Sequence, residues 1–305
     1  MNEVLKKEIE DFGSNSASHT LTDKTFSNEG YKTAIIRATR DMTARTLRPK
    51  DKVTGKLIDL LLDGPGDVTI EKYVGKKSFL EVISEFFKSS VKDQTAFDTW
   101  HNNVCNDILL PAIRHFYTNG DKQNSEVCYG KAQKILNMTF KGCYCLQGAE
   151  ERKEYFKHCH MALDSFILAW YKENKGHIRT EWSKLSEKEY IAIKNYIRTV
   201  KPDIDLFKGL TPFEKEFFIW RLEMMKVTVK EINKSYGGFV KDDYATEYLE
   251  AHGMLNELKM SKALLGMCDL KELAQDTDFI KSLEIIKDSD KKRETADYLL
   301  NKLQP

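Results

Sequence analysis

The sequence predicts an all-α protein, with a helical core and a C-terminal helical extension. Six prolines and sixteen glycines in 305 residues leave long stretches without helix breakers. Within these stretches Leu, Ile, Lys and Glu recur at the spacing of amphipathic helices. With 41% hydrophobic and 11% aromatic residues, the chain can bury one large core or two modest ones.

Three regions are expected along the chain. Residues 1–28 form a partly flexible N-terminal segment, in which a short helix over 1–12 leads into a Ser/Thr/Asn-rich connector. Residues 29–225 form the helical core. Beyond Lys226 the composition shifts to shorter and more charged segments, so 226–305 is expected to be an accessory helical region.

The first helix of the core is expected over 31–47 and carries recurring arginines. Arg37 and Arg40 are three residues apart, so they lie on neighbouring positions of one helical face. We expect both to bind phosphate. The alternative is a solvated face whose arginines pair with carboxylates.

Further elements follow from turn signals and apolar spacing. A short apolar segment over 56–62 ends at a turn over 63–66, and an amphipathic helix is expected over 78–87. Pro111 should kink or split the next helix, because it lacks an N–H group and crowds the preceding turn. A turn over 118–121 closes that segment.

Two capping patterns mark helix starts later in the chain. Ser186 followed by Glu189 has the spacing of a capping box and predicts a helix through about Val200. Thr211 and Glu214 repeat the spacing, and the proline between them suits the first helical position.

The stretch 128–174 carries the strongest chemical signal. A helix is expected to begin near Gly130 with Lys131 and Lys134 in its opening turns, and another to begin at Asp164, whose side chain can cap it. Helix N-termini and neighbouring ammonium groups both favour a neutral amine, which is a nucleophile. A lysine that attacks and a carboxylate that stabilises developing positive charge together support covalent catalysis.

The run Gly130-Lys131-Ala132-Gln133-Lys134-Ile135-Leu136, followed by Met161-Ala162-Leu163-Asp164-Ser165, resembles the helix-hairpin-helix DNA glycosylases of the 8-oxoguanine type. The archaeal branch is the most similar, and bacterial proteins that share its fold are similar too. The resemblance implies that Lys131 or Lys134 attacks the sugar of a flipped nucleotide and that Asp164 assists. The predicted function is therefore excision of a damaged or modified base from DNA, with or without lyase activity.

A flipped base needs a pocket with aromatic walls and a few polar contacts. Burial in the core is the alternative explanation for each aromatic candidate. The candidates for contact with the substrate are Trp100, His101, Tyr129, Gly130, Asn137, Lys141, His158, His160, Phe166 and Trp170.

Two other chemistries are weaker alternatives. Cys143-x-Cys145 followed by His158-Cys159-His160 offers ligand types that zinc prefers, but the spacing within each pair is too short for a zinc finger. We expect buried thiols and no metal or cofactor. Arg152 and His158 have a spacing that resembles helical ribonucleases of the HEPN kind.

The remaining alternative is a module that binds a nucleotide, nucleic acid or protein without turnover, with Gly130, Lys131 and Lys134 holding phosphate. The net charge of +1 gives no long-range attraction to nucleic acid, so such binding needs a local patch. The N-terminus lacks a signal-peptide pattern, and no apolar run is long enough to span a membrane. We therefore expect a cytoplasmic protein without membrane contact. The expected partner is DNA or a nucleotide.

Overall fold

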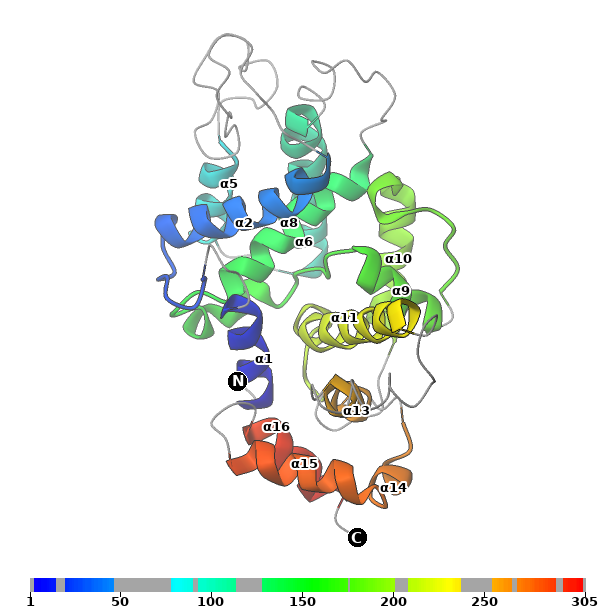
Figure 1. Cartoon of the computed structure of the whole chain (residues 1–305). Helices are drawn as coiled ribbons and strands as arrows, with labels where there is room; N and C mark the ends of the chain where they lie inside the picture. The colour runs from blue at the N-terminus through cyan, green and yellow to red at the C-terminus, as the bar shows by residue number, and fades with distance from the viewer. Residues whose placement is uncertain are drawn as a thin grey trace. The chain divides into compact units, whose positions relative to one another are not determined.

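The computed structural model (Figure 1) describes residues 3–14, 20–46, 78–89, 93–113, 128–174, 176–200, 208–236, 254–264, 268–288 and 293–303. These residues form helices and no β-strand, which confirms the all-α prediction; one isolated bridge joins Thr25 and Gln147. Within these ranges, no helix is both long and apolar enough to cross a membrane. The expected elements over 56–62, 63–66 and 118–121 lie outside the described residues.

The contacts divide the chain into two units. We call Glu10–Arg198 the central unit, and Met1–Ile9 together with Thr199–Pro305 the terminal unit. Helix α1 (Glu3–Ser14) begins in the terminal unit and ends in the central one. The helical segments of the central unit after α1 are α2 (Asn28–Thr46), α5 (Phe79–Phe86), α6 (Gln94–Asn103), η1 (Val104–Leu109), α8 (Tyr129–Tyr144), η2 (Glu150–Phe156), α9 (Ser165–Glu173), η3 (Trp182–Lys184) and α10 (Glu187–Thr199).

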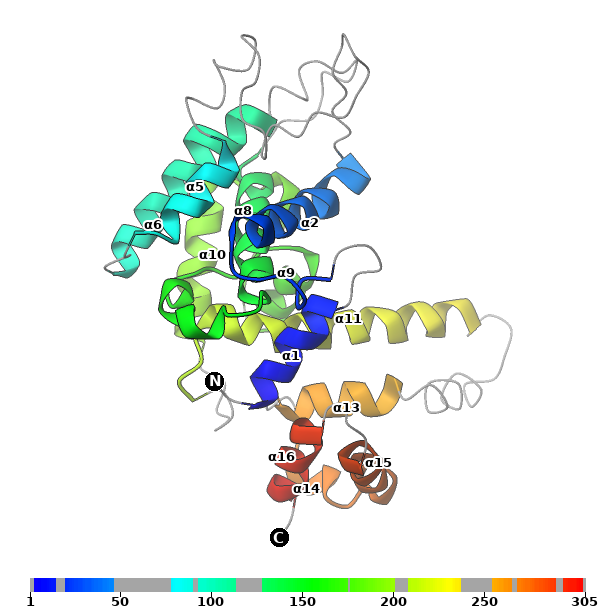
Figure 2. The same cartoon turned by 90° about the vertical axis from the view of Figure 1, so that its left-hand side faces the viewer.

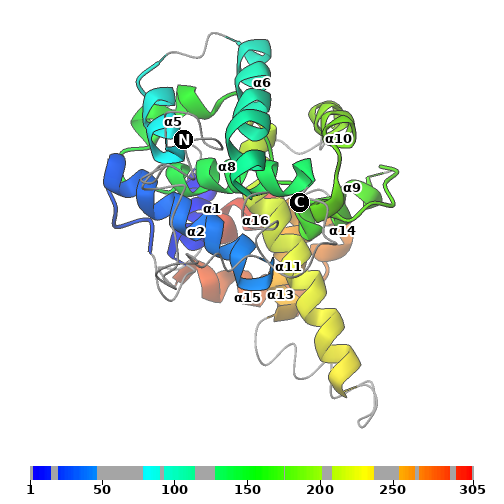
Figure 3. The same cartoon turned by 90° about the horizontal axis from the view of Figure 1, so that it is seen from above.

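Helix α8 is the centre of this unit, and nearly all of its residues are buried. Helix α2 packs along α8, as Figures 1 and 3 show. A Cβ at Gly142 would lie 2.9 Å from Cβ of Ala34, so the absence of a side chain lets the two helices approach closely.

An aromatic core joins α5 and α6 to α8. Phe86 contacts Phe97, Trp100 and Phe140, with ring centroids 4.5 to 5.9 Å apart. Helices α5 and α6 overlap in the view of Figure 2, and the contact between Phe86 and Phe97 joins them. Burial of these large rings stabilises this part of the unit and holds α6 in contact with α5 and α8.

The segment around Pro111 does not stop at the proline. Residues Val104–Leu109 form a π-helix, in which the N–H of Leu110 reaches the carbonyl of Cys105. The helix then continues to residue 113. The helical turn just before Pro111 is therefore wider than an α-helical turn. A proline ring crowds the carbonyl of the preceding turn in a regular α-helix, and the π-helix changes the position of that carbonyl.

The predicted capping patterns are confirmed. Ser186 and Glu189 bond reciprocally at the start of α10. Thr211 and Glu214 do the same at α11 (Pro212–Tyr236). Each pair satisfies backbone N–H groups that a helix start leaves without partners.

The terminal unit also contains α13 (Met254–Leu264), α14 (Leu270–Leu273), α15 (Thr277–Asp288) and α16 (Arg293–Leu303). Helix α11 packs against α13, and α15 packs against α16. The guanidinium of Arg221 on α11 pairs with the buried Glu8 of α1 and donates to Ser261 of α13. Helix α11 runs through the expected domain boundary at 225/226, which stays a prediction.

Candidate functional site

Gln133 and Asn137, one turn apart on α8, attach the segment 157–164 to this helix. The side-chain amide of Gln133 donates to the carbonyl of Leu163 and accepts from its N–H, at 2.9 and 3.1 Å. Asn137 donates to the carbonyl of Met161 at 3.1 Å. Both side chains are fully buried. They therefore supply, from inside the core, the partners that this non-helical segment needs.

Asp164 caps α9, as predicted. Its Oδ1 accepts from the N–H groups of Phe166 and Ile167, at 2.9 and 3.0 Å, and the residue is 6% exposed. Asp164 forms no ion pair with any residue that the structure describes. Its carboxylate is thus held by α9 and is not paired with either predicted lysine.

The two candidate lysines of α8 lie on other faces of the helix than Gln133. At 3.6 residues per turn, Lys131 is rotated by about 200° from Gln133 and Lys134 by about 100°. Lys131 is 5% exposed, and the ammonium of the half-buried Lys134 lies 4.4 Å from the centre of the Trp182 ring. The face of α8 that contacts Leu163, next to Asp164, is therefore not the face that carries Lys131.

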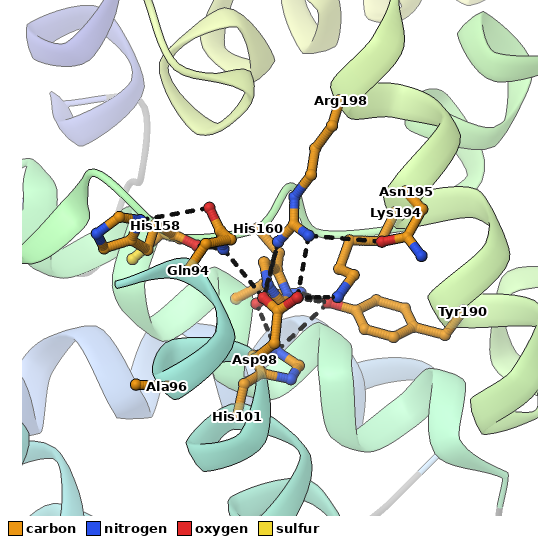
Figure 4. Close-up of polar contacts among 12 residues, drawn as sticks. Gln94, Ala96, Asp98, His101, His158, His160, Tyr190, Lys194, Asn195 and Arg198 are labelled. Carbon is orange, nitrogen blue, oxygen red and sulfur yellow. Dashed lines mark hydrogen bonds and ion pairs between the residues drawn. The ribbon is translucent and has the colours of Figure 1, made fainter. Parts of the chain in front are cut away.

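A lysine and an aspartate do meet elsewhere in the central unit. Nζ of Lys194, on α10, lies 2.5 Å from Oδ2 of Asp98, on α6. Arg198 approaches both oxygens of the same carboxylate, at 3.0 and 2.7 Å, and His160 Nε2 lies 2.7 Å from Oδ1 (Figure 4). The side chains of Asp98 and Arg198 are 25% and 26% exposed, so this cluster reaches solvent. We call Asp98, His160, Lys194 and Arg198 the Asp98 cluster.

Gln94 extends the Asp98 cluster toward His158. Its Nε2 donates to Asp98 Oδ1 at 3.0 Å and to the carbonyl of His158 at 2.9 Å. His158 Nδ1 lies 3.3 Å from Gln94 Oε1, as Figure 4 shows. The carboxylate thus receives hydrogen bonds from α6, from segment 157–164 and from α10.

A buried network continues inward from the Asp98 cluster. The hydroxyl of Tyr190 lies 2.7 Å from His160 Nδ1 and 3.0 Å from Asn137 Nδ2. His101 Nε2 lies 2.9 Å from Asn137 Oδ1. The rings of His101 and Tyr190 stack with an interplanar angle of 5°. Polar groups of four separate segments are therefore joined through Tyr190 and Asn137.

The charges of the cluster favour an ionised carboxylate. Burial opposes ionisation of Asp98, but hydrogen bonds from His160, Arg198 and Lys194 outweigh it and hold the pKa of Asp98 well below its usual range. Burial lowers the pKa of His160 to about 4, against the opposing effect of Asp98. At neutral pH the cluster holds one carboxylate, two cations and a neutral imidazole.

The Lys194 amine differs from an ordinary surface lysine. Burial lowers its pKa, Arg198 lowers it further, and the hydrogen bond to Asp98 opposes both effects. A lowered pKa increases the fraction of neutral amine, the form that attacks carbon. This is the environment that a lysine nucleophile needs, beside a carboxylate that stays charged.

Several of the residues predicted to contact the substrate pack against or form hydrogen bonds with other residues of the protein. Trp100 packs in the aromatic core, and Trp170 is 6% exposed with its carbonyl accepting from Asn174. The hydroxyl of Tyr129 lies 3.5 Å from His101 Nδ1. The N–H of Phe166 belongs to the α9 cap. Of the predicted contacts, His160 and His158 lie in or beside the Asp98 cluster, and His101 and Asn137 lie behind it.

The start of α8 is closed by the η3 segment. Gly130 donates its N–H to the carbonyl of Leu185 at 2.9 Å, and a Cβ at Gly130 would lie 1.9 Å from the carbonyl oxygen of Trp182. Backbone therefore occupies the place where a phosphate was expected beside Gly130. Lys141, further along α8, is fully buried with Nζ 4.3 Å from the centre of the Phe12 ring.

Of the two predicted phosphate ligands, Arg37 is described in full. It donates to the carbonyls of Phe12 and Gly13, at 2.8 and 3.3 Å, and lies over the Phe12 ring. Its guanidinium thus satisfies carbonyls at the end of α1. The side chain of Arg40 lies outside the part of the structure that is described.

The residues of the zinc alternative and of the ribonuclease alternative lie in separate environments. Cys143, Cys145 and Cys159 are buried free thiols, and burial raises the pKa of each. Among the described residues, no group of three or more Cys, His, Asp or Glu side chains could hold a metal ion. Arg152 lies over the Phe26 ring, whereas His158 faces Gln94.

Sequence reasoning missed Asp98, Lys194 and Arg198, although a signal for them was present. Tyr190, Lys194 and Arg198 recur every four residues on α10, as do Gln94 and Asp98 on α6. Such rows place polar groups on one helical face. In the structure Tyr190 and Lys194 are buried, and the side chains of Asp98 and Arg198 are 25% and 26% exposed.

In comparisons with known proteins, the chain matches no protein-family model, no curated protein and no solved structure.

Proposed function

We propose that this chain excises a base from nucleic acid, with Lys194 as the amine nucleophile and Asp98 as the carboxylate that supports it. The observation that carries the proposal is the 2.5 Å contact between Lys194 Nζ and Asp98 Oδ2, in a cluster that is partly buried and still reaches solvent. The resemblance of 128–174 to base-excising glycosylases supplies the substrate class, and the structure supplies a different lysine and aspartate for the chemistry.

The reaction would proceed by displacement at the sugar. The ammonium of Lys194 first loses a proton to solvent. The neutral amine then forms a bond to the sugar carbon while the glycosidic bond to the base breaks, and the base leaves with the electron pair and takes a proton from solvent. Positive charge develops on the sugar, and the ionised Asp98 offsets it. Ring opening then breaks the bond between the sugar carbon and the ring oxygen, and one proton moves from the attached nitrogen to that oxygen. The product is a protonated Schiff base, which carries the same unit charge as the ammonium it replaces.

Arg198 has two roles in this proposal. It keeps Asp98 ionised through a bidentate contact, and it lowers the pKa of Lys194 through charge repulsion. Its partial exposure also gives the site a cation that an incoming phosphate can approach. The surplus of one positive charge in the Asp98 cluster suits a polyanionic substrate.

Borohydride trapping tests this proposal. The protein is incubated with duplexes that carry damaged or modified bases or an abasic site, and reduction converts a Schiff base into a stable adduct. We expect an adduct for the unmodified protein and for Lys188→Met, an exposed lysine on the same helix. We expect none for Lys194→Met. An adduct that persists in Lys194→Met but disappears in Lys131→Ala or Lys134→Ala would return the nucleophile to α8.

Binding without turnover is the second candidate, and the Lys134 ammonium over Trp182 favours it. Both residues are half-buried, and Lys134 makes no ion pair with the described residues. An aromatic face beside a cation suits a nucleobase and its phosphate. This candidate predicts that an oligonucleotide raises the melting temperature without release of a base. Trp182→Ala should abolish that rise while Lys194→Met keeps it.

A further inference from the structure

We infer that a series of hydrogen bonds, in which each group donates toward Asp98, positions this carboxylate. Tyr190 and His160 are the positioning residues. We call this series the hydrogen-bond chain. The inference rests on the proposed function for its catalytic consequence. Its structural content, the protonation state of two buried histidines, is independent of any activity.

The direction of the chain follows from the partners of His160. A neutral imidazole has one N–H and one acceptor nitrogen. Nε2 lies 2.7 Å from the ionised Asp98, which can only accept, and 3.0 Å from Arg198 Nη2, which can only donate. Arg198 Nη2 already donates to the same Asp98 oxygen at 2.7 Å, and the carboxylate is the closer partner of Nε2, so we assign the proton to Nε2. Nδ1 is then the acceptor, and the hydroxyl of Tyr190 donates to it across 2.7 Å.

The same rule fixes the next members. Because the Tyr190 hydroxyl donates its hydrogen bond to His160, its oxygen is left as an acceptor, and Asn137 Nδ2 lies 3.0 Å from it. Asn137 Oδ1 therefore accepts from His101, whose Nε2 lies 2.9 Å away. His101 Nδ1 is left as an acceptor, and the Tyr129 hydroxyl and the Cys105 thiol face it at 3.5 and 3.8 Å.

The inner end prevents reversal of the chain. Gln133 Oε1, the Met161 carbonyl and the Tyr190 oxygen all lie within 3.1 Å of Asn137 Nδ2, so its two hydrogens are shared among three acceptors. If the amide turned around, Asn137 Oδ1 would face Gln133 Oε1 and the Met161 carbonyl, neither of which can donate. Burial, together with the nearby His160, holds the pKa of His101 well below its usual range, so this ring stays neutral. The donors and acceptors therefore agree from Tyr129 to Asp98.

The consequence for Asp98 concerns the tautomer of His160. If the proton moved to Nδ1, the lone pair of Nε2 would face Asp98 Oδ1 at 2.7 Å, and the two would repel. Such repulsion would move the carboxylate away from its present contact with Lys194. By donating to Nδ1, Tyr190 excludes this tautomer and keeps Asp98 where the amine needs it.

Deletion of the Tyr190 hydroxyl isolates this effect. In Tyr190→Phe, Asn137 keeps two acceptors, whereas His160 Nδ1 loses its donor. Tyr196→Phe is the matched control, because its hydroxyl donates to the Asn174 carbonyl from the same helix. Long-range ¹H–¹⁵N spectra of the full chain report the tautomer of each histidine, and trapping on a duplex reports the rate.

We expect His160 and His101 to be neutral with the proton on Nε2 in the unmodified protein at pH 7. In Tyr190→Phe we expect a second His160 tautomer and a trapping rate lower by up to roughly 100-fold, while Tyr196→Phe changes neither. A proton on Nδ1 of His160 in the unmodified protein would overturn the inference, whether or not Tyr190→Phe folds. A single unchanged tautomer in a folded Tyr190→Phe would also overturn it.

If no adduct or base release occurs with any substrate, the proposed function fails. The spectra still decide the direction of the hydrogen-bond chain in that case.

Discussion

The ammonium of Lys194 lies 2.5 Å from Asp98 Oδ2, although 96 positions separate the two residues along the chain. Arg198, one turn further along α10, donates hydrogen bonds to both oxygens of the same carboxylate. A carboxylate shared by two cations stabilises their close approach, and it also makes the three side chains depend on one another.

Removal of the Asp98 charge should expose this dependence. Asp98→Asn leaves Lys194 and Arg198 side by side without a counter-charge, and we expect the free energy of unfolding to fall by roughly 2 kcal/mol. Urea denaturation at pH 7 measures it. Asp107→Asn is the control, because Asp107 is exposed near the same helix. Equal stability of the two variants would mean that the Asp98 ion pairs contribute nothing.

The amide of Gln133 should be among the most sensitive groups in the core. Gln133→Leu keeps the volume but leaves both backbone groups of Leu163 without their partner, so we expect a loss of roughly 3 kcal/mol. Gln147→Ala, at an exposed position, should change stability by less than about 0.5 kcal/mol. A mild effect of Gln133→Leu would show that water replaces the missing amide.

Asp164 should behave as a helix cap. Asp164→Ala removes the acceptor for two N–H groups of α9 and should cost about 1 kcal/mol, whereas Asp164→Asn keeps an acceptor and should cost less. Thermal denaturation separates the two. If Lys194 and Asp98 carry the chemistry, Asp164→Asn retains trapping of the substrate. Loss of trapping in a stable Asp164→Asn would restore Asp164 to the mechanism.

The stability of the protein should fall as the pH drops from about 6.5 toward 4. His160 has a pKa of about 4 in the folded chain, against an ordinary value near 6.5, so the unfolded chain binds the proton more readily in this window. Asp98, Lys194, Arg198, His101 and Tyr190 surround the ring, and burial is the main cause of the lowered pKa.

The contribution of His160 is fully present above pH 6.5 and is lost on acidification, amounting to roughly 3 kcal/mol. Urea denaturation at pH 7 and pH 4.5 measures the loss. The difference between the two pH values should shrink in His160→Gln, because glutamine does not titrate. It should stay unchanged in His177→Gln, since His177 is exposed. The same pH dependence in all three proteins would assign the acid sensitivity to other groups.

Local patterns in the sequence determined the helices and several of their ends. Helix breakers are rare, apolar residues repeat at helical spacing, and the Ser186, Thr211 and Asp164 caps each lie within three residues of the groups they bind. These interactions are short in sequence, so a reader of the chain finds them without coordinates.

The tertiary structure alone decided which charged groups meet. Lys131, Lys134 and Asp164 lie near the starts of two helices within one stretch of the sequence, yet Asp164 is bound to its own helix and Lys134 lies over Trp182. Asp98, His160 and Lys194 come from two helices and a non-helical segment, and their contact depends on the angles at which these pack. Periodicity gives the face of each helix on which a side chain lies, but packing determines which faces oppose each other.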